Sequence, residues 1–352
     1  MKIIIEAFAL RNIRSGTGRY AIDMIKKMSE KHEIVVITRD PDPEAVRNIP
    51  PHVELINVNK YAYVPTIIYL YFFLGLYLRK FKCDFAIFLI GCRPLFYKNS
   101  YDLVICDFNH IIFPDSVAFI TRQIYRFSSS SSISKCRNLI AISKGTSTKS
   151  QKFYGRTADF IINPSLNKFK DLVPQTVDGL PDSFSLYVGA IEPRKNICNL
   201  MIAHEYAVDS GLISDKLLLV SSQSWFEGGV NTILSKMKHS KVISSIDESM
   251  LAWMYSKCER VYMTTYYEGY GMPAAEAQLF DAKVICTDIE ELREASKNNA
   301  IYVKTSAIDI YEGIAMSLID KPSDQEKELI SDLDNFESQI DKYISYIESE
   351  KK

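Results

Sequence analysis

The chain has 352 residues, of which 47% are hydrophobic and 24% are charged, with 42 Lys and Arg against 43 Asp and Glu. This length exceeds one typical hydrophobic core and predicts two domains. A net charge of −1 argues against bulk binding to nucleic acid, although it leaves room for a local basic face.

Cysteine usage and the start of the chain bear on its compartment. Seven cysteines are spread singly, with no C-x-x-C pair. An odd number without paired spacing predicts neither a disulfide framework nor a zinc site, and it fits a reducing cytoplasm. The opening "MKIIIEAFAL" is too short for a signal peptide, so we expect a cytoplasmic protein.

The first half of the chain alternates short apolar runs with helical stretches. "KIIIEAFAL" is typical of a buried strand, and "TGRYAIDMIKKMSEK" of an amphipathic helix. The further β-rich runs are "EIVVITRD", "VELINV", "FAIFLI", "DLVICDF" and "NLIAIS". Such alternation predicts a parallel sheet with helices on both faces, and we assign this first domain to residues 1–162.

One segment of the first domain, "YVPTIIYLYFFLGLYL" at 63–78, carries no charge. A bilayer span needs about 20 apolar residues, so a helix buried or half-buried in the domain is the preferred interpretation. A helix lying on a membrane surface stays open, because tyrosines favour interfaces and Arg79 and Lys80 follow at once. A true span is the least favoured of the three interpretations.

Turn residues gather in "NPSLNKFKDLVPQTVDGLPD", which predicts an interdomain linker over 163–182. The alternation of strands and helices then resumes and predicts a second doubly wound domain over 183–322. Residues 323–352 read as charged helix without strands.

Three segments fall at predicted carboxyl ends of strands, where open α/β sheets bind ligands. In "SGTGRYA", Gly16, Thr17 and Gly18 open the first helix and fit G-x-G-x-x-A, although the dinucleotide fingerprint places its first glycine directly after the strand. Both a simple turn and backbone amides facing a phosphate stay open here. In "YVGAIEPRKN", Arg194 and Lys195 precede a helix, a position that suits a phosphate, although exposed basic pairs are often only solvated.

The third segment is "YYEGYGMPAAEA", residues 266–277. Its glycines, Gly269 and Gly271, allow the backbone to approach an anion, and we place Pro273 at the first helical position with Glu276 in the first turn. Glu268 and Glu276 would repel an anion but would accept hydrogen bonds from sugar diols. A nucleotide-sugar satisfies all three segments, since it combines hydroxyls with a diphosphate.

These segments resemble known motifs. "EGYGMPAAEA" resembles the E-x7-E signature of the retaining glycosyltransferases of family 4, and "VGAIEPRKN" resembles their phosphate-binding segment in the form of the bacterial mannosyltransferase branch. "SGTGRYA" is similar to a loop of that branch, and the matches cover most of residues 1–305. The resemblance implies a GT-B fold, in which two Rossmann-like domains with doubly wound parallel sheets face each other across a cleft. It also implies that the C-terminal helix, within residues 323–352, folds back toward the first domain.

The resemblance also implies roles by position. Glu276 would hold the ribose diol, Glu268 would contact the transferred hexose, and Arg194 and Lys195 would bind the diphosphate and stabilise the departing nucleotide. The residues that would line sugar and phosphate are Gly269, Tyr270, Gly271 and Met272. From the first domain, Gly16, Thr17 and Gly18 would approach the diphosphate.

The acceptor side departs from the family pattern. "CDFNH" stands where His-Asp is frequent, so Asp107 is retained as a catalytic candidate and Cys106 occupies the place of a sugar-contacting histidine. His110 either supplies an imidazole nearby or is structural. After the signature helix, Asp281 and Lys283 replace the usual glycine and proline.

We therefore predict a hexosyltransferase that acts with retention and needs neither a metal ion nor a cofactor. GDP-mannose is the preferred donor, with a UDP- or dTDP-sugar as the alternative. The acceptor would be a glycan or lipid-linked oligosaccharide in surface-polysaccharide assembly, with residues 63–80 at the inner membrane face. A non-catalytic sugar-nucleotide or glycan-binding protein stays open, as does an NAD(P)-dependent oxidoreductase, because G-x-G-x-x-A occurs at 16–21 and 269–274.

Overall fold

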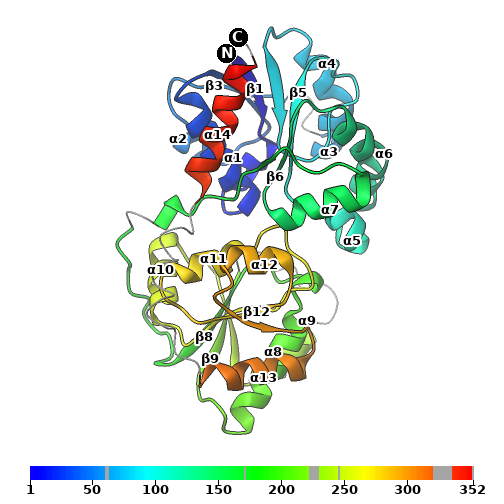
Figure 1. The fold of residues 1–352 in the computed structure, drawn as a ribbon. Coiled ribbons are helices and arrows are strands. Elements are labelled where there is room, and N and C mark those ends of the chain that lie inside the picture. The colour runs from blue at the N-terminus through cyan, green and yellow to red at the C-terminus, as the bar shows by residue number, and fades with distance from the viewer. Residues whose placement is uncertain (60–62, 170–171, 222–229, 245, 320–334, 351–352) are drawn as a thin grey trace. The chain divides into compact units, whose positions relative to one another are not determined.

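The computed structural model describes residues 1–59, 63–169, 172–221, 230–244, 246–319 and 335–350. The chain forms two compact units: unit 1 is Met1–Ser165 with Asn335–Lys352, and unit 2 is Leu166–Asp334. Each unit is a parallel sheet covered by helices (Figure 1). The expected pair of doubly wound α/β domains is confirmed.

Unit 1 is built on seven parallel strands in the order β3-β2-β1-β4-β5-β6-β7. The strands are β1 (Lys2–Glu6), β2 (Glu33–Thr38), β3 (Glu54–Asn57), β4 (Phe85–Phe88), β5 (Tyr101–Ile105), β6 (Leu139–Ala141) and β7 (Phe160–Ile161). The central strands are buried on both faces, which explains their continuous apolar sequences. The strand order reverses between β1 and β4, so the carboxyl ends of these two strands form the switch point of the sheet.

The helices of unit 1 connect and cover these strands. They are α1 (Gly16–Ser29), α2 (Pro43–Asn48), α3 (Thr66–Ile68), α4 (Gly75–Leu78), α5 (Asn109–Ile112), α6 (Phe119–Lys135), α7 (Lys144–Tyr154) and α14 (Phe336–Ser349). The C-terminal helix α14 lies beside α1 (Figure 1), and its buried Tyr343 donates a hydrogen bond to Asp102 Oδ2 at 2.6 Å. An ion pair of 2.8 Å between Lys27 and Glu337 joins the two helices at the surface.

The aromatic segment at 63–78 is half-buried in unit 1. It runs through α3, a π-helical stretch at Tyr69–Leu74, and α4. Leu70, Leu74 and Leu78 are buried, whereas Phe72 and Leu76 are 40% and 46% exposed. Within the described ranges, no helix combines the length and apolar character that a membrane crossing requires.

Unit 2 is built on six parallel strands in the order β10-β9-β8-β11-β12-β13. The strands are β8 (Phe184–Val188), β9 (Lys216–Val220), β10 (Ser240–Ile243), β11 (Val261–Met263), β12 (Val284–Thr287) and β13 (Ile301–Val303). The helices are α8 (Ile197–Asp209), α9 (Val230–Leu234), α10 (Glu248–Lys257), α11 (Met272–Gln278), α12 (Glu290–Ala295) and α13 (Ala307–Ser317). Here the strand order reverses between β8 and β11.

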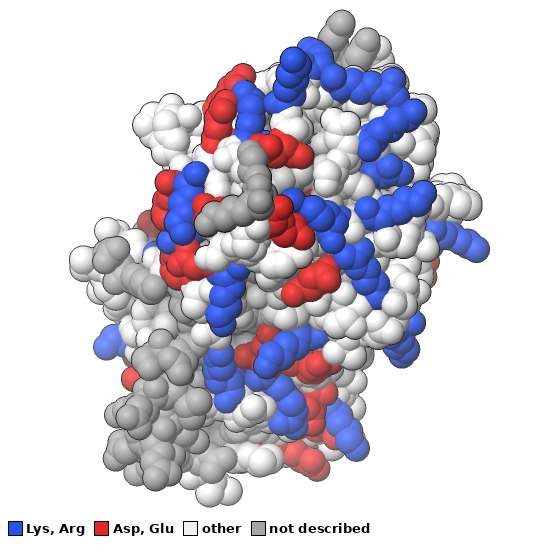
Figure 2. All heavy atoms as spheres, turned by 45° about the horizontal axis from the view of Figure 1, so that its top comes forward, with Lys and Arg blue, Asp and Glu red and all other residues white. Residues whose placement is uncertain are grey.

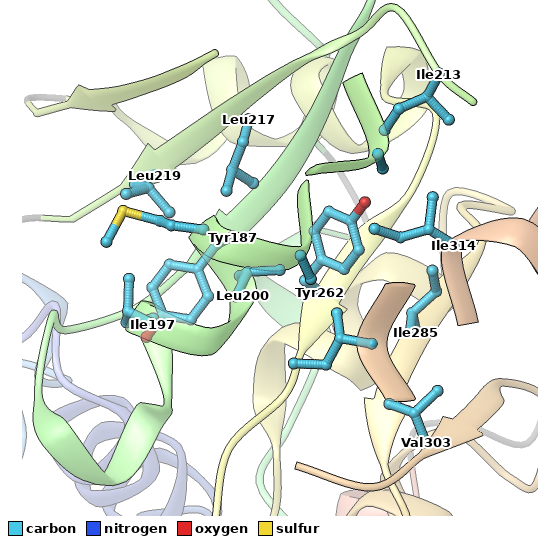
Figure 3. Close-up of a cluster of buried hydrophobic side chains, with 14 of the residues drawn as sticks. Tyr187, Ile197, Leu200, Ile213, Leu217, Leu219, Tyr262, Ile285, Val303 and Ile314 are labelled. Atoms are coloured by element: carbon cyan, nitrogen blue, oxygen red, sulfur yellow. The ribbon is translucent and has the colours of Figure 1, made fainter. Parts of the chain in front are cut away.

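One face of this sheet packs on α8 and α13 around a continuous apolar core (Figure 3). Tyr187 and Tyr262 from neighbouring strands point into it together with Leu200 of α8 and Ile314 of α13. This core fixes β8 and β11 side by side, and with them the two loops that leave their carboxyl ends.

The boundary between the units lies at Ser165. Part of the segment expected as a linker, Asn167–Phe169, is a 3₁₀ turn that belongs to unit 2. The ring of Phe169 is buried there, 5.4 Å from that of Phe280. Residues 320–334, which cover part of the expected C-terminal segment, lie outside the described residues.

The surface charge is mixed. Lys and Arg are interspersed with Asp and Glu over most of the face seen in Figure 2, while Lys and Arg predominate along its upper right edge. Such a distribution fits the net charge of −1 and provides local basic areas on this face.

Candidate functional site

Two loops meet at the switch point of the unit 2 sheet. The loop after β8 contains a 3₁₀ turn at Pro193–Lys195 and ends at Asn196. This residue has a φ of 57° and lies directly before the first residue of α8. The side chain of Asn196 donates to the backbone oxygen of Thr264 at 3.0 Å, and Thr265 Oγ1 donates to that of Arg194 at 2.9 Å. Thr264 and Thr265 therefore lie where the two loops are tied together.

These loops bring three of the predicted residues into contact. Lys195 Nζ donates to Glu268 Oε1 in a close ion pair, and Arg194 Nη1 lies 3.6 Å from Glu268 Oε2. Arg194 also donates through Nε to Glu192 at 2.9 Å. Glu268 is only 7% exposed, so these charges interact with little screening by water.

The protonation of this group follows from its surroundings. Burial alone would raise the pKa of Glu268, but Lys195 and Arg194 outweigh it and hold the pKa below its ordinary value. Burial also lowers the pKa of Lys195, and Glu268 offsets that effect only in part. The Glu268 carboxylate is therefore ionised at neutral pH. An anion that approaches Lys195 would stabilise the charged form of the lysine further.

The glycine loop is shaped by Gly271. Its φ is 103°, a conformation that other residues rarely adopt, so the backbone favours glycine here. A Cβ at this position would also lie 2.4 Å from Leu292 Cδ2, so the leucine side chain would have to shift. The helix α11 begins at Met272, directly after this residue, and Tyr270 is buried beside it. Gly269 lies in the same loop, between Glu268 and Tyr270.

Glu276 does not occupy the first turn of α11, which corrects the sequence prediction. The helix starts at Met272 with Pro273 in second place, because Gly271 caps it, and the first turn holds no acidic residue. Glu276 is instead buried with two partners: Tyr255 donates to Oε2 at 3.0 Å, and Lys168 forms an ion pair with Oε1 at 2.7 Å. The carboxylate is thus held by the charge and hydroxyl of other elements, and not by the helix dipole.

Sequence reasoning missed both partners of Glu276. Lys168 stands in the segment expected as a linker, and Tyr255 stands inside a predicted helix without any local motif. Only their distance in space from Glu276 reveals them.

In unit 1, the loop 16–18 forms the start of α1. Ser15 caps this helix and accepts a hydrogen bond from Gly18 N at 3.1 Å. A Cβ on Gly18 would lie 2.3 Å from the backbone oxygen of Asn12, so close packing explains this glycine. Gly16 and Thr17 hold the first two helical positions, whose N–H groups have no acceptor within a helix.

The acceptor-side candidates follow β5. Asp107 Oδ1 accepts from the backbone N–H of Asn109 at 3.0 Å, which shapes the turn into α5. Burial raises the pKa of the Cys106 thiol to about 12, so it is neutral at pH 7. His110 Nε2 lies 3.1 Å from the Tyr154 hydroxyl, its ring stacks on Tyr125, and burial lowers its pKa.

A further carboxyl group lies at the switch point of unit 1. Glu6, at the carboxyl end of β1, is fully buried and accepts from the backbone N–H groups of Phe8 at 2.8 Å and Leu89 at 3.1 Å. Burial raises its pKa to about 7. The only signal in the sequence is a single acid inside the apolar run "KIIIEAFAL".

Among the residues that the structure describes, no cluster of three or more His, Cys, Asp or Glu side chains is placed to hold a metal ion.

Comparison with known proteins gives relatives over most of the chain. No protein-family model matches the sequence. The chain is 21% identical over 346 residues to the O-antigen chain mannosyltransferase B of Escherichia coli, covering 88% of each protein. It is 24% identical over 212 residues to the O-antigen chain mannosyltransferase RfbU of Salmonella typhimurium, covering 58% of this chain and 57% of the relative.

Solved structures share the fold at low sequence identity. Sucrose-phosphate synthase from Thermosynechococcus elongatus aligns with a TM-score of 0.77 at 16% identity and covers 99% of both chains. WaaG, a glycosyltransferase involved in lipopolysaccharide biosynthesis, aligns with a TM-score of 0.67 at 14% identity over 97% of this chain and 98% of its own. Anabaena HepE, solved in complex with UDP and glucose, gives 0.68 at 13% identity over 98% of this chain and all of its own. The chain therefore has the GT-B fold that these solved structures share, and it is similar in sequence to bacterial O-antigen mannosyltransferases.

Proposed function

We propose that the chain transfers a hexose from a nucleotide-diphosphate sugar to a hydroxyl of a glycan, with retention at the anomeric carbon. The buried contact of Glu268 with Lys195 and Arg194, at the carboxyl edge of the unit 2 sheet, carries this proposal. The cations suit a diphosphate and the carboxylate suits sugar hydroxyls, and a nucleotide-sugar offers both. Glu276 would bind the ribose diol, and Tyr270, Gly271 and Met272 would line the sugar and phosphate.

The cations also supply the chemistry that the reaction needs. The bond between the anomeric carbon and the diphosphate oxygen breaks, and the negative charge that develops on the leaving group would be stabilised by Arg194 and Lys195. The acceptor oxygen bonds to the same face of the sugar, and its proton passes to the departing diphosphate. Under this proposal neither a protein base nor a metal ion takes part, and Asp107 would orient the acceptor.

GDP-mannose is the preferred donor because the sequence relatives are named as O-antigen mannosyltransferases. A UDP- or dTDP-sugar is the alternative, and the HepE complex with UDP and glucose is an example of a similar fold with another nucleotide. For the acceptor we propose a lipid-linked glycan of surface-polysaccharide assembly. The exposed side chains of Phe72, Phe73 and Leu76, with Arg79 and Lys80 next in sequence, would contact the cytoplasmic membrane face.

A panel of GDP-, UDP-, dTDP- and ADP-sugars and NAD(P) tests this proposal by thermal shift. We expect stabilisation by one sugar nucleotide, reduced in Lys195→Ala and Glu268→Ala and kept in the surface variant Lys257→Ala. Transfer of the same sugar to a lipid-linked acceptor should then fail in both site variants. Stabilisation by NAD(P) alone, or unchanged transfer in Lys195→Ala and Glu268→Ala, would refute the assignment.

A further inference from the structure

A pocket of about 410 Å³ opens between α5, α6 and α7 of unit 1, which lie side by side in Figure 1. Its lining includes His110, Ile111, Arg122, Gln123, Arg126 and Tyr154. His110 lies in α5, shortly after the predicted acceptor-side residues Cys106 and Asp107 in the chain. No motif in the sequence marked the α6 side of this pocket.

The α6 side of the pocket is cationic. Arg122, Gln123 and Arg126 are spaced so that they share one face of the helix. Arg126 forms neither an ion pair nor a hydrogen bond with any described residue. Arg122 lies 3.3 Å from Asp115, whose side chain is fully exposed, so this pair is weak and easily exchanged for a ligand.

The opposite side offers neutral hydrogen-bonding groups. The imidazole of His110 and the hydroxyl of Tyr154 contact each other at 3.1 Å, and both face the pocket. Because burial lowers the pKa of His110, this side is uncharged at neutral pH. The pocket therefore pairs two guanidinium groups with groups that suit sugar hydroxyls.

Apolar side chains border the arginines. Phe119, one turn before Arg122 on the same helix, is 65% exposed, and the Arg122 guanidinium lies 5.6 Å from the centre of its ring. Ile111 lines the pocket and is 37% exposed. A diphosphate with an apolar chain would place its phosphates against Arg122 and Arg126, and the first carbons of its chain against Phe119 and Ile111.

We propose that this pocket binds the sugar-diphosphate headgroup of a lipid-linked acceptor, with Arg122 and Arg126 on the diphosphate. His110, Gln123 and Tyr154 bind hydroxyls of the first sugar, and Phe119 and Ile111 contact the lipid chain. This assignment rests on the proposed glycosyltransfer, since it names the part of the acceptor that unit 1 recognises.

Isothermal titration calorimetry of the full chain with farnesyl diphosphate tests the proposal, in the presence of GDP to occupy the nucleotide site. In Arg122→Gln/Arg126→Gln we expect affinity at least about tenfold weaker, because two charge-assisted contacts are lost. Lys135→Gln, an exposed cation at the end of the same helix, should leave affinity unchanged. Circular dichroism and the thermal midpoint of both variants should match the parent, since neither Arg122 nor Arg126 is buried.

Two comparisons separate the outcomes. Farnesyl diphosphate should bind more tightly than inorganic diphosphate; equal affinity would overturn the lipid-linked assignment and indicate a soluble phosphate. Unchanged farnesyl diphosphate affinity in the double variant would overturn the site itself. GDP affinity should be the same in all three proteins. A chain that fails to bind GDP refutes the proposed donor, and the titration is then repeated with the nucleotide of the panel that does bind, so that the nucleotide site stays occupied.

Discussion

The buried ion pair between Lys195 and Glu268 makes a quantitative prediction about stability. Replacing Lys195 with Met leaves the Glu268 carboxylate, which is 7% exposed, with Arg194 at 3.6 Å as its remaining cationic partner. Loss of one partner from a buried pair costs about 3–5 kcal/mol, and the remaining arginine places the expected cost near 3 kcal/mol. Glu268→Gln should cost a similar amount, because it leaves two partly buried cations close together.

The double variant Lys195→Met/Glu268→Gln separates this effect from simple loss of packing. Residues in direct contact couple by about 0.5–3 kcal/mol, so the double variant should be more stable than the sum of the single changes allows. Urea unfolding followed by tryptophan fluorescence reports on unit 2, because the residues of unit 1 include no tryptophan. Lys257→Met, on the surface of α10, should change stability by no more than about 0.5 kcal/mol. Additive losses in the double variant would show that the two charges do not depend on each other.

Three further predictions concern the supports of the two sites. Gly271→Ala should destabilise unit 2 by roughly 1–3 kcal/mol, since its φ is 103° and its Cβ would meet a neighbour; Gly155→Ala, at φ 71° in open space, should cost only about 1 kcal/mol in urea unfolding. Lys168→Met should lower GDP affinity several-fold, about 1 kcal/mol or more, because Glu276 loses the cation that positions it. If calorimetry gives the same GDP affinity for the variant and the parent, Lys168 does not contribute to the site. For Glu6, the folded pKa of about 7 exceeds the ordinary 4.5, so the folded state binds more protons between these values. The free energy of unfolding of unit 1 should therefore fall by up to about 3 kcal/mol as the pH rises from 4.5 to 7, and Glu6→Gln should remove that step in amide exchange of β1 and β4.

The fold could be predicted from the sequence because the central strands of both sheets are buried on both faces. Runs such as "KIIIE" and "KLLLV" can be recognised as buried strands without knowing which strands they pair with. Their alternation with amphipathic stretches predicts parallel sheets. The same local signals located Arg194, Lys195 and Glu268, since the basic pair and the acid lie in glycine- and proline-marked loops after strands.

Pairings across the chain could not be predicted in the same way. Lys168 meets Glu276 only after the segment before β8 packs against α10 through Phe169 and Tyr255. Glu6 becomes a buried acid because β1 lies beside β4, whose following residue Leu89 donates to it. The position of Glu276 in α11 was misplaced by a single residue, because the left-handed Gly271 starts the helix at Met272 instead of Pro273. Asp281 takes a left-handed conformation, with φ 54°, at the position where the family pattern has glycine.

The contacts of Glu268 imply a competition for the cations that we propose for the diphosphate. Lys195 and Arg194 are held by Glu268, and a phosphate must share them. If Glu268 also holds the hexose, Glu268→Gln should have opposite effects on two measurements. GDP, which lacks the sugar, should bind about tenfold more tightly, because a charge that competes for the cations is gone. Transfer from the sugar nucleotide should instead fall by at least about a hundredfold. Calorimetry with GDP and a radiolabelled transfer assay measure the two quantities, with Glu259→Gln, at the amino end of the sheet, as the control. Weaker GDP binding in Glu268→Gln would show that Glu268 orders the cations more than it competes for them, and tighter binding with full transfer would remove Glu268 from contact with the sugar.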